Sequence, residues 1–228
     1  MMRLRQNSTY QIYLYFIRNG FRAAKPVFLF NFTENPHTMY HIEIISSSVR
    51  KGRNSHRVTQ YLQNKINSGT VAKAVILDLM EYNFPIFDER LKYQYNPTPQ
   101  MLEYAARIKN ADGIIIVTPE YNGGYPPALK NAVDFLYEEW RRKPVAISTV
   151  SDGSFGGTQV ITSIQFSLWK MKALTVPAMF PNPKVQELYD EKGIALNPAE
   201  TDKRSTPFIE ELYYWIKAAN KMKEQSAV

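Results

Sequence analysis

The segment PEYNGGY (119–125) follows the apolar run DGIIIVT and combines residue types that can bind a flat, polar ligand. Its two adjacent glycines let the backbone adopt positive φ angles or approach a ring closely. The N–H group of Asn122 can then face a polar ring edge, with Tyr121 and Tyr125 as walls. An ordinary turn before a Pro-initiated helix would explain the Gly, Asn and Pro residues, but not Glu120 and the two tyrosines.

A second group of polar residues, SSSVRKGRNSHR (46–57), follows the apolar strand-like segment 40–46. Three serines, Arg50 and Arg53 precede a predicted helix, so hydroxyl, guanidinium and backbone N–H groups can converge on one anion. A phosphate monoester, with nearly two negative charges, suits this density of donors. The alternative is a solvated basic helix start capped by Asn54 or Ser55.

A third segment, SDGSFGG (151–157), adds three glycines after another apolar run. By itself it is compatible with a simple helix entry. Other chemistries lack their motifs: G-x-G-x-x-G after the first strand, G-x-x-x-x-G-K-[ST], and the nucleophile elbow G-x-S-x-G are all absent. The histidines His37, His41 and His56 have no metal-binding spacing, so we predict no metal site.

The elements that must position these loops alternate between strand and helix. We predict strands at 40–46, 71–79, 112–118, 143–151 and about 173–180, and helices near 58–66, from Pro99, from Pro127, over 158–172 and from about Thr206. Repeated β-α units predict a doubly wound, five-stranded parallel α/β sheet with helices on both faces. In such sheets ligands bind outside the carboxyl ends of the strands, where all three loops lie.

Composition narrows the function classes further. The 228-residue chain has no cysteine, which excludes disulfides and thiolate chemistry and suits a reducing, cytoplasmic compartment. It has no apolar run of about 18 residues, so we expect no membrane span. Residues 1–38 hold five basic residues and one acidic residue, which leaves only +3 of the +7 formal charge on the rest. Because the tyrosines are not interleaved with Lys and Arg on one element, we expect no nucleic-acid partner.

The first 38 residues differ from the rest of the chain. Their short apolar patches keep neither a helix nor a strand period, and the loose likeness of MMRLRQNSTYQIYLYFI to a signal peptide lacks a small-residue cleavage site. We therefore predict an N-terminal extension (1–38) outside the fold, followed by one domain (39–228).

Taken together, TPEYNGGYPPALKNAVD, SSVRKGRNSHRV and SDGSFGG resemble, in this order of specificity, the NADPH-dependent FMN reductase family. That family has a flavodoxin-like fold and includes quinone and azo-dye reductases. The resemblance covers about residues 39–190. One departure is Ser47, where the family usually has a glycine.

The resemblance implies which residues hold the cofactor FMN. In chain order, the first loop (46–57) would bind its phosphate, the second loop (119–125) its isoalloxazine ring, and the third loop (151–157) would flank the ring and ribityl chain. The implied residues are Ser46, Ser48, Arg50, Arg53, Asn54 and Ser55; Pro119, Glu120, Tyr121, Asn122 and Gly123; and Ser151, Gly153, Gly156 and Gly157.

The function implied by the resemblance is a flavin-dependent oxidoreductase. Hydride would pass from NADPH or NADH to FMN, and electrons would then pass to a small-molecule acceptor at the same place, with no side chain needed as a proton shuttle. The family also implies a homodimer or homotetramer. Two other classes stay open: a non-catalytic flavin-binding redox sensor, and a flavodoxin-type electron carrier, although such carriers usually have an acidic surface.

Overall fold

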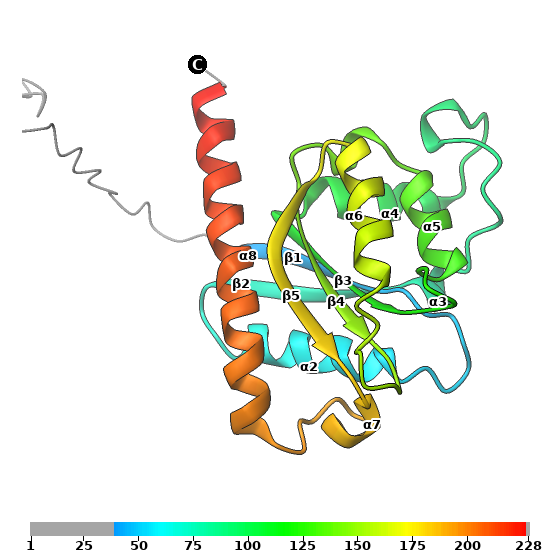
Figure 1. Ribbon diagram of the computed structural model, residues 1–228. Coiled ribbons are helices and arrows are strands. Elements are labelled where there is room, and N and C mark those ends of the chain that lie inside the picture. Colours follow the sequence, from blue (N-terminus) through cyan, green and yellow to red (C-terminus); the bar gives the residue numbers. More distant parts are fainter. Residues whose placement is uncertain (1–38, 227–228) are drawn as a thin grey trace, which may run out of the picture. The chain divides into compact units, whose positions relative to one another are not determined.

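The computed structural model describes residues 39–226, whose centre is one five-stranded sheet (Figure 1). The strands are β1 (Tyr40–Ser46), β2 (Ala72–Asp78), β3 (Gly113–Pro119), β4 (Pro144–Val150) and β5 (Leu174–Asn182). All neighbouring strands are parallel and their order is β2-β1-β3-β4-β5. The predicted doubly wound parallel sheet is confirmed, and its order is the flavodoxin-like one.

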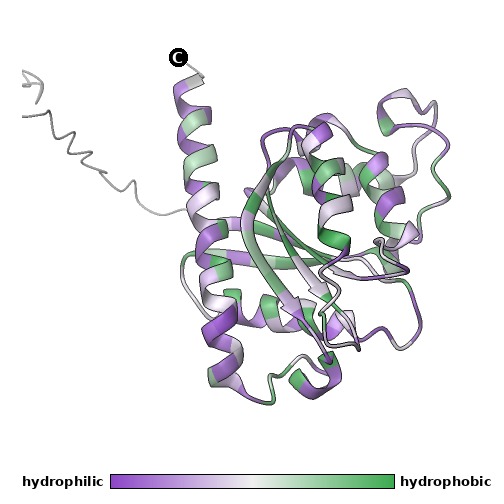
Figure 2. Cartoon of the chain, viewed as in Figure 1, coloured by the Kyte–Doolittle hydropathy of each residue, from purple (hydrophilic) through white to green (hydrophobic). Residues whose placement is uncertain are grey.

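Helices cover both faces of the sheet. Ile44 and Ile45, neighbours in β1, lie in two different buried clusters because successive strand residues point to opposite faces. The first cluster is shared with α2 (Ser55–Asn67) and α8 (Pro198–Ser226). The second is shared with α4 (Pro99–Asn110), α5 (Pro127–Asp134) and α6 (Val160–Lys170). Figure 2 shows the matching pattern, with hydrophobic residues concentrated in the strands between the helices. Burial on both faces explains why β3 reads as a nearly continuous apolar run.

Short elements complete the connections. They are the helices α3 (Leu79–Tyr82) and α7 (Val185–Leu188) and the 3₁₀ turns η1 (Leu91–Tyr93) and η2 (Glu138–Trp140).

The last helix begins earlier than predicted. We expected its first turn at about Thr206, with Leu212, Ile216 and Ala219 on one face of the helix. In the structure Pro198 lies in that first turn, and Pro207 lies inside α8. The extra turns are held against α2, where the hydroxyls of Tyr61 and Ser205 are 2.6 Å apart and buried. This packing compensates for the hydrogen bond that Pro207 cannot donate.

Among residues 39–226, no helix is both long enough and apolar enough to cross a bilayer. The predicted extension, residues 1–38, lies outside the described residues, and its separation from the fold stays a prediction.

Candidate functional site

A pocket of about 180 Å³ lies at the carboxyl ends of β1, β3 and β4. In the order found here, β1 and β3 flank the point where the chain reverses its direction across the sheet, which is where doubly wound folds bind ligands. The pocket is lined by Ser48, Arg50, Gly52, Arg53, Asn54, Ser55, Pro119, Glu120, Tyr121, Val150, Ser151, Asp152 and Val185. The three loops singled out in the sequence therefore meet in one place.

The start of α2 is an open anion site on one wall of this pocket. Asn54 precedes the helix, but its side chain makes no capping hydrogen bond, and the first turn holds no acidic residue. Ser55 is 4% exposed, and its Oγ has no hydrogen-bond partner within residues 39–226. A buried hydroxyl without a partner costs free energy, so this atom is poised to bind a ligand group. The N–H groups at the start of the helix and the helix dipole favour a negative charge at the same point.

The two arginines of the first loop have different surroundings. Arg50 is exposed, lies 5.8 Å from the centre of the Tyr121 ring, and has no ion-pair partner among residues 39–226. Arg53 is largely buried and binds the carboxylate of Asp78 with both of its terminal nitrogens. Only Arg50 of this pair is therefore free to meet an incoming anion.

The serines of the first loop mostly hold the loop in place. Ser46 is buried and its Oγ lies 3.0 Å from Nδ1 of His56, so it does not line the pocket. Ser47, which replaces the family's usual glycine, donates its hydroxyl to the carbonyl of Val117 at 2.9 Å and so ties the loop to β3. Burial, and then the nearby guanidinium of Arg53, lower the pKa of His56 below its ordinary value, so this ring adds no charge at neutral pH.

The second loop is a tight hairpin turn. Tyr121 and Gly124 exchange backbone hydrogen bonds of 2.7 and 3.0 Å, and the residues between them, Asn122 and Gly123, both have positive φ angles of 52° and 80°. This is the two-residue turn in which Asn-Gly is strongly preferred. Asn122 and Gly123 thus form the turn itself and do not line the pocket. Ser48 accepts or donates a 2.9 Å hydrogen bond with the Tyr121 hydroxyl, which joins the first loop to the second.

Tyr125, expected to wall the ligand together with Tyr121, lies elsewhere. Its hydroxyl is 3.1 Å from that of Ser167 in α6, and its ring packs against the buried cluster on that face of the sheet. It therefore positions the start of α5 against α6.

The glycines of the third loop allow close packing. Gly156 and Gly157 have φ angles of 63° and 70°. A Cβ atom at Gly157 would lie 3.0 Å from the Val150 carbonyl and 3.4 Å from Cβ of Glu120. Like Gly153, these two glycines do not line the pocket, but they let the third loop approach the second. Of the residues that we predicted in this loop, Ser151 is the one that lines the pocket.

Four lining residues were missed by the sequence reasoning: Gly52, Val150, Asp152 and Val185. The first three are adjacent in the sequence to predicted residues, so the same loop patterns could have indicated them. Val185 has no local signal, since it comes from the segment after β5. Its N–H donates to the Ser151 carbonyl at 3.3 Å, which brings α7 against the third loop.

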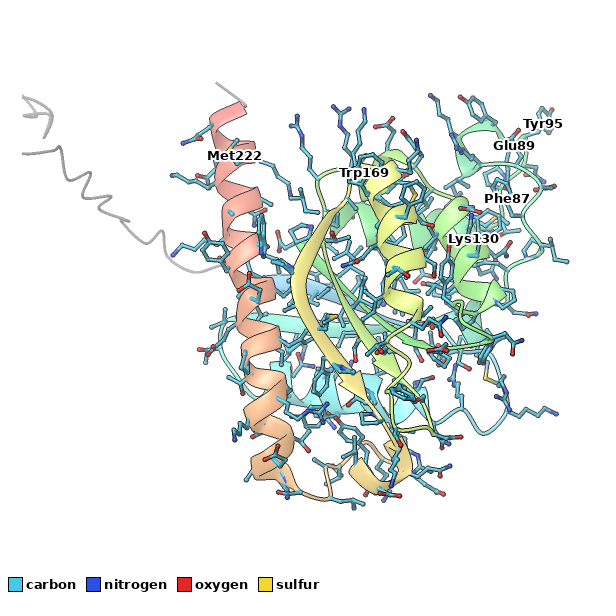
Figure 3. The ribbon with its side chains drawn as sticks, in the orientation of Figure 1. Phe87, Glu89, Tyr95, Lys130, Trp169 and Met222 are labelled. Carbon is cyan, nitrogen blue, oxygen red and sulfur yellow. The ribbon has the colours of Figure 1, made fainter. Side chains whose placement is uncertain are left out.

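A larger hollow, of about 410 Å³, lies away from these loops, along residues 85–101. Figure 3 shows Glu89 and Tyr95 in this part of the chain, beyond α5. Its lining includes Asp88 and Glu89 but no lysine or arginine, so it would repel a phosphate. The smaller pocket at the strand ends is the better site because its charge and position suit an anionic cofactor.

Comparison with known proteins supports the same conclusion. A family model described as NADPH-dependent FMN reductase matches residues 40–187. An NAD(P)H-dependent FMN reductase of a Nectria species, ntnL, is 34% identical over 154 residues, which are 63% of this chain and 76% of the relative. A quinone reductase of Pseudomonas putida is 25% identical over 186 residues, 78% of this chain and 96% of the relative.

A solved structure shows the same fold. FerB, a flavoenzyme NAD(P)H:acceptor oxidoreductase from Paracoccus denitrificans, has a TM-score of 0.64 and 24% sequence identity, covering 79% of this chain and 99% of that one. The strand order, the position of the pocket and the family match agree. The chain belongs to the NADPH-dependent FMN reductase family of flavin-dependent oxidoreductases.

Proposed function

We propose that this enzyme uses FMN, bound in the pocket at the ends of β1, β3 and β4, to pass electrons from NAD(P)H to a quinone, azo or flavin acceptor by a ping-pong mechanism. The observation that carries the proposal is the hydroxyl of Ser55, which is buried at the start of α2, lines the pocket and has no hydrogen-bond partner among the described residues. Its surroundings suit a phosphate, the group that distinguishes FMN from riboflavin.

The residues of the pocket would divide the binding between them. Ser55, the N–H groups of the first turn of α2 and Arg50 would hold the phosphate. Tyr121, fixed through its hydroxyl to Ser48, would form a wall beside the second loop. The residues that we assigned to FMN but that lie outside the lining would act by shaping the turns, as described above for Asn122, Gly123, Gly156 and Gly157.

The size of the pocket supports an open site. A volume of about 180 Å³ is below the roughly 300–1,000 Å³ typical of pockets that enclose a small molecule. It is large enough for the phosphate end of FMN but not for the whole cofactor, so we place the ring outside it. When bound, FMN supplies the chemistry, accepting a hydride from NAD(P)H and passing electrons to the acceptor. The chain's own part is to bind and orient, and donor and acceptor would take turns at one accessible face.

Steady-state kinetics test this proposal. The purified protein should be yellow, release FMN on denaturation, and oxidise NAD(P)H with a quinone. Double-reciprocal plots at several quinone concentrations should be parallel, because the two substrates would occupy the same place in turn. Intersecting lines would contradict the ping-pong mechanism but not the use of FMN. A colourless protein that neither binds FMN nor oxidises NAD(P)H with any acceptor would refute the whole proposal.

Arg50→Ala should weaken FMN binding by roughly 1.5–3 kcal/mol, the scale of a hydrogen bond to a charged group. Riboflavin, which lacks the phosphate, should be affected far less. Fluorescence titration of the flavin-free protein with each ligand measures both. Ser55→Ala is a companion variant that should show the same selectivity with a smaller loss. Equal losses for the two ligands would mean that Arg50 acts through the fold and not on the phosphate.

We also propose that the enzyme is a homodimer or homotetramer. Phe166 and Trp169 of α6 are 62% and 66% exposed, and their ring centres are 5.8 Å apart; Figure 3 shows Trp169 on this helix. Exposed aromatic pairs of this kind are enriched at protein interfaces. Light scattering should give a mass at least twice the 26.4 kDa of the chain, and a variant with both residues changed to Glu should be a monomer. A monomeric wild type would contradict this proposal.

A further inference from the structure

Arg53, in the first loop (46–57, the proposed phosphate loop), forms an ion pair with Asp78. The side chains are only 14% and 6% exposed. Arg53 donates from both terminal nitrogens to the two carboxylate oxygens, a planar two-point contact that only arginine can make. Asp78 is the last residue of β2, and its Oδ1 also accepts from the N–H of Met80 at 3.0 Å, so the carboxylate is fixed by α3 as well.

The same guanidinium holds the first loop. Nη1 of Arg53 donates to the Ser48 carbonyl at 2.7 Å. Ser48 in turn contacts the Tyr121 hydroxyl through its side chain, and its Oγ lies 3.5 Å from the N–H of Arg50. One chain of contacts therefore runs from the end of β2, through Arg53, to the residues that face the pocket.

The charge of Arg53 is already satisfied by this pair. A phosphate that bound Arg53 directly would have to displace Asp78 or share the guanidinium with it, and it would leave a nearly buried carboxylate beside a bound dianion. Separating a buried ion pair is unfavourable because one charge is then left without a partner. The contacts favour a supporting role for Arg53 over a direct one.

We propose that Arg53 and Asp78 are positioning residues, which hold the phosphate loop in its binding shape before the cofactor arrives, and that Arg53 does not itself bind the phosphate. This inference rests on the proposed FMN site. It replaces the expectation that both arginines of the loop contact FMN, and it adds Asp78, which no motif in the sequence singled out.

The sign of one substitution separates the two roles. If Arg53 positions the loop, Asp78→Asn loosens it and weakens FMN binding about tenfold, on the scale of coupling between residues of one network. If Arg53 is instead a phosphate ligand restrained by Asp78, the same substitution frees its charge and FMN binds more tightly. Riboflavin affinity should change less than threefold in either case, since the loop faces the phosphate.

Further variants and a control complete the experiment. Arg53→Lys keeps the charge but not the two-point geometry, so a positioning role predicts a loss like that of Asp78→Asn. Lysine binds phosphate as a point charge, so a direct phosphate ligand would be replaced by lysine with a smaller loss. The double variant Arg53→Met/Asp78→Asn should bind FMN no more weakly than either single variant, because both substitutions break the same Arg53–Asp78 interaction. Asp202→Asn, which breaks the 2.7 Å pair with Lys65 near the other end of α2, is the matched control and should leave FMN affinity unchanged.

The full chain, stripped of flavin and checked for folding by circular dichroism, is titrated with FMN and with riboflavin. Tighter FMN binding by Asp78→Asn, or near-normal binding by Arg53→Lys, overturns the inference while wild-type FMN binding stands. Equal losses for FMN and riboflavin also overturn it, because they indicate a general effect on the fold. A wild type that does not bind FMN overturns the proposed function itself. If Asp78→Asn does not fold, Arg53→Lys still decides.

Discussion

Arg107→Met should lower the free energy of unfolding by about 3–5 kcal/mol, the cost of leaving a buried charge without its partner. Glu43 lies in the middle of β1 and is 1% exposed. Arg107 of α4 binds both of its carboxylate oxygens, with Nε 3.0 Å from Oε1 and Nη2 2.5 Å from Oε2. The guanidinium also donates to the carbonyl of Ile76 and the hydroxyl of Tyr82. Without it, Glu43 would keep, among the side chains of residues 39–226, only the contact with His41 at 2.9 Å.

Urea unfolding of the flavin-free protein measures this loss. Adding Glu43→Gln to Arg107→Met removes the stranded charge and should recover part of the stability. Arg141, whose partner Glu138 is exposed, offers a matched control: Arg141→Met should cost less than about 1 kcal/mol, as is usual for surface pairs. Similar losses for Arg107 and Arg141 would show that the buried pair is not a main support of the sheet.

Gly193→Ala should lower the free energy of unfolding by about 2–5 kcal/mol, from two independent causes. Its φ angle is +74°, a conformation that costs an L-residue about 1–2 kcal/mol. In addition, the new Cβ would lie 2.5 Å from the Arg57 carbonyl and 2.9 Å from the Tyr61 N–H nitrogen. Both atoms belong to the backbone of α2, so no side chain can rotate away, and overpacking of this kind costs roughly 1–3 kcal/mol.

Gly52→Ala is the control that separates the two causes. Gly52 has a similar φ angle of +67°, but a Cβ there meets no atom within 4 Å. It should therefore lose only the conformational part, about 1–2 kcal/mol. Equal melting temperatures for the two variants would mean that the chain after α7 yields to the added methyl group. A larger loss for Gly193→Ala would show that this segment presses on the first turns of α2, beside the anion site.

The sheet was predictable because its signals are local. A run of apolar residues indicates each strand, and burial on both faces makes β3 almost wholly apolar. The positions of the loops then followed from the general rule for doubly wound sheets. The start of α8 was missed because contacts of Tyr61 with Ser205, far away in the sequence, stabilise the turns that precede Pro207.

The site was only partly predictable, since the role of each side chain depends on distant partners. In the sequence, Ser55 is a possible helix cap. Its proposed role as an anion ligand rests on its burial without a hydrogen-bond partner among residues 39–226. Arg50 and Arg53 look alike in the sequence, but Asp78 at the end of β2 neutralises one of them. Asn122 and Gly123 form a two-residue hairpin turn with positive φ angles at both residues, and their contact with the flavin ring stays a prediction.

The pocket is walled by three loops and by Val185 of α7, and these segments follow four different strands. A molecule bound there would contact segments that lie far apart in the sequence. By thermodynamic linkage, a ligand that binds only the folded state adds RT ln(1 + [L]/Kd), which is about 2.7 kcal/mol when its free concentration is one hundred times Kd. That gain is as large as the loss expected from many single substitutions. The fraction of enzyme that stays folded after a destabilising substitution, or at a raised temperature, should therefore depend on the free flavin concentration as well as on the sequence.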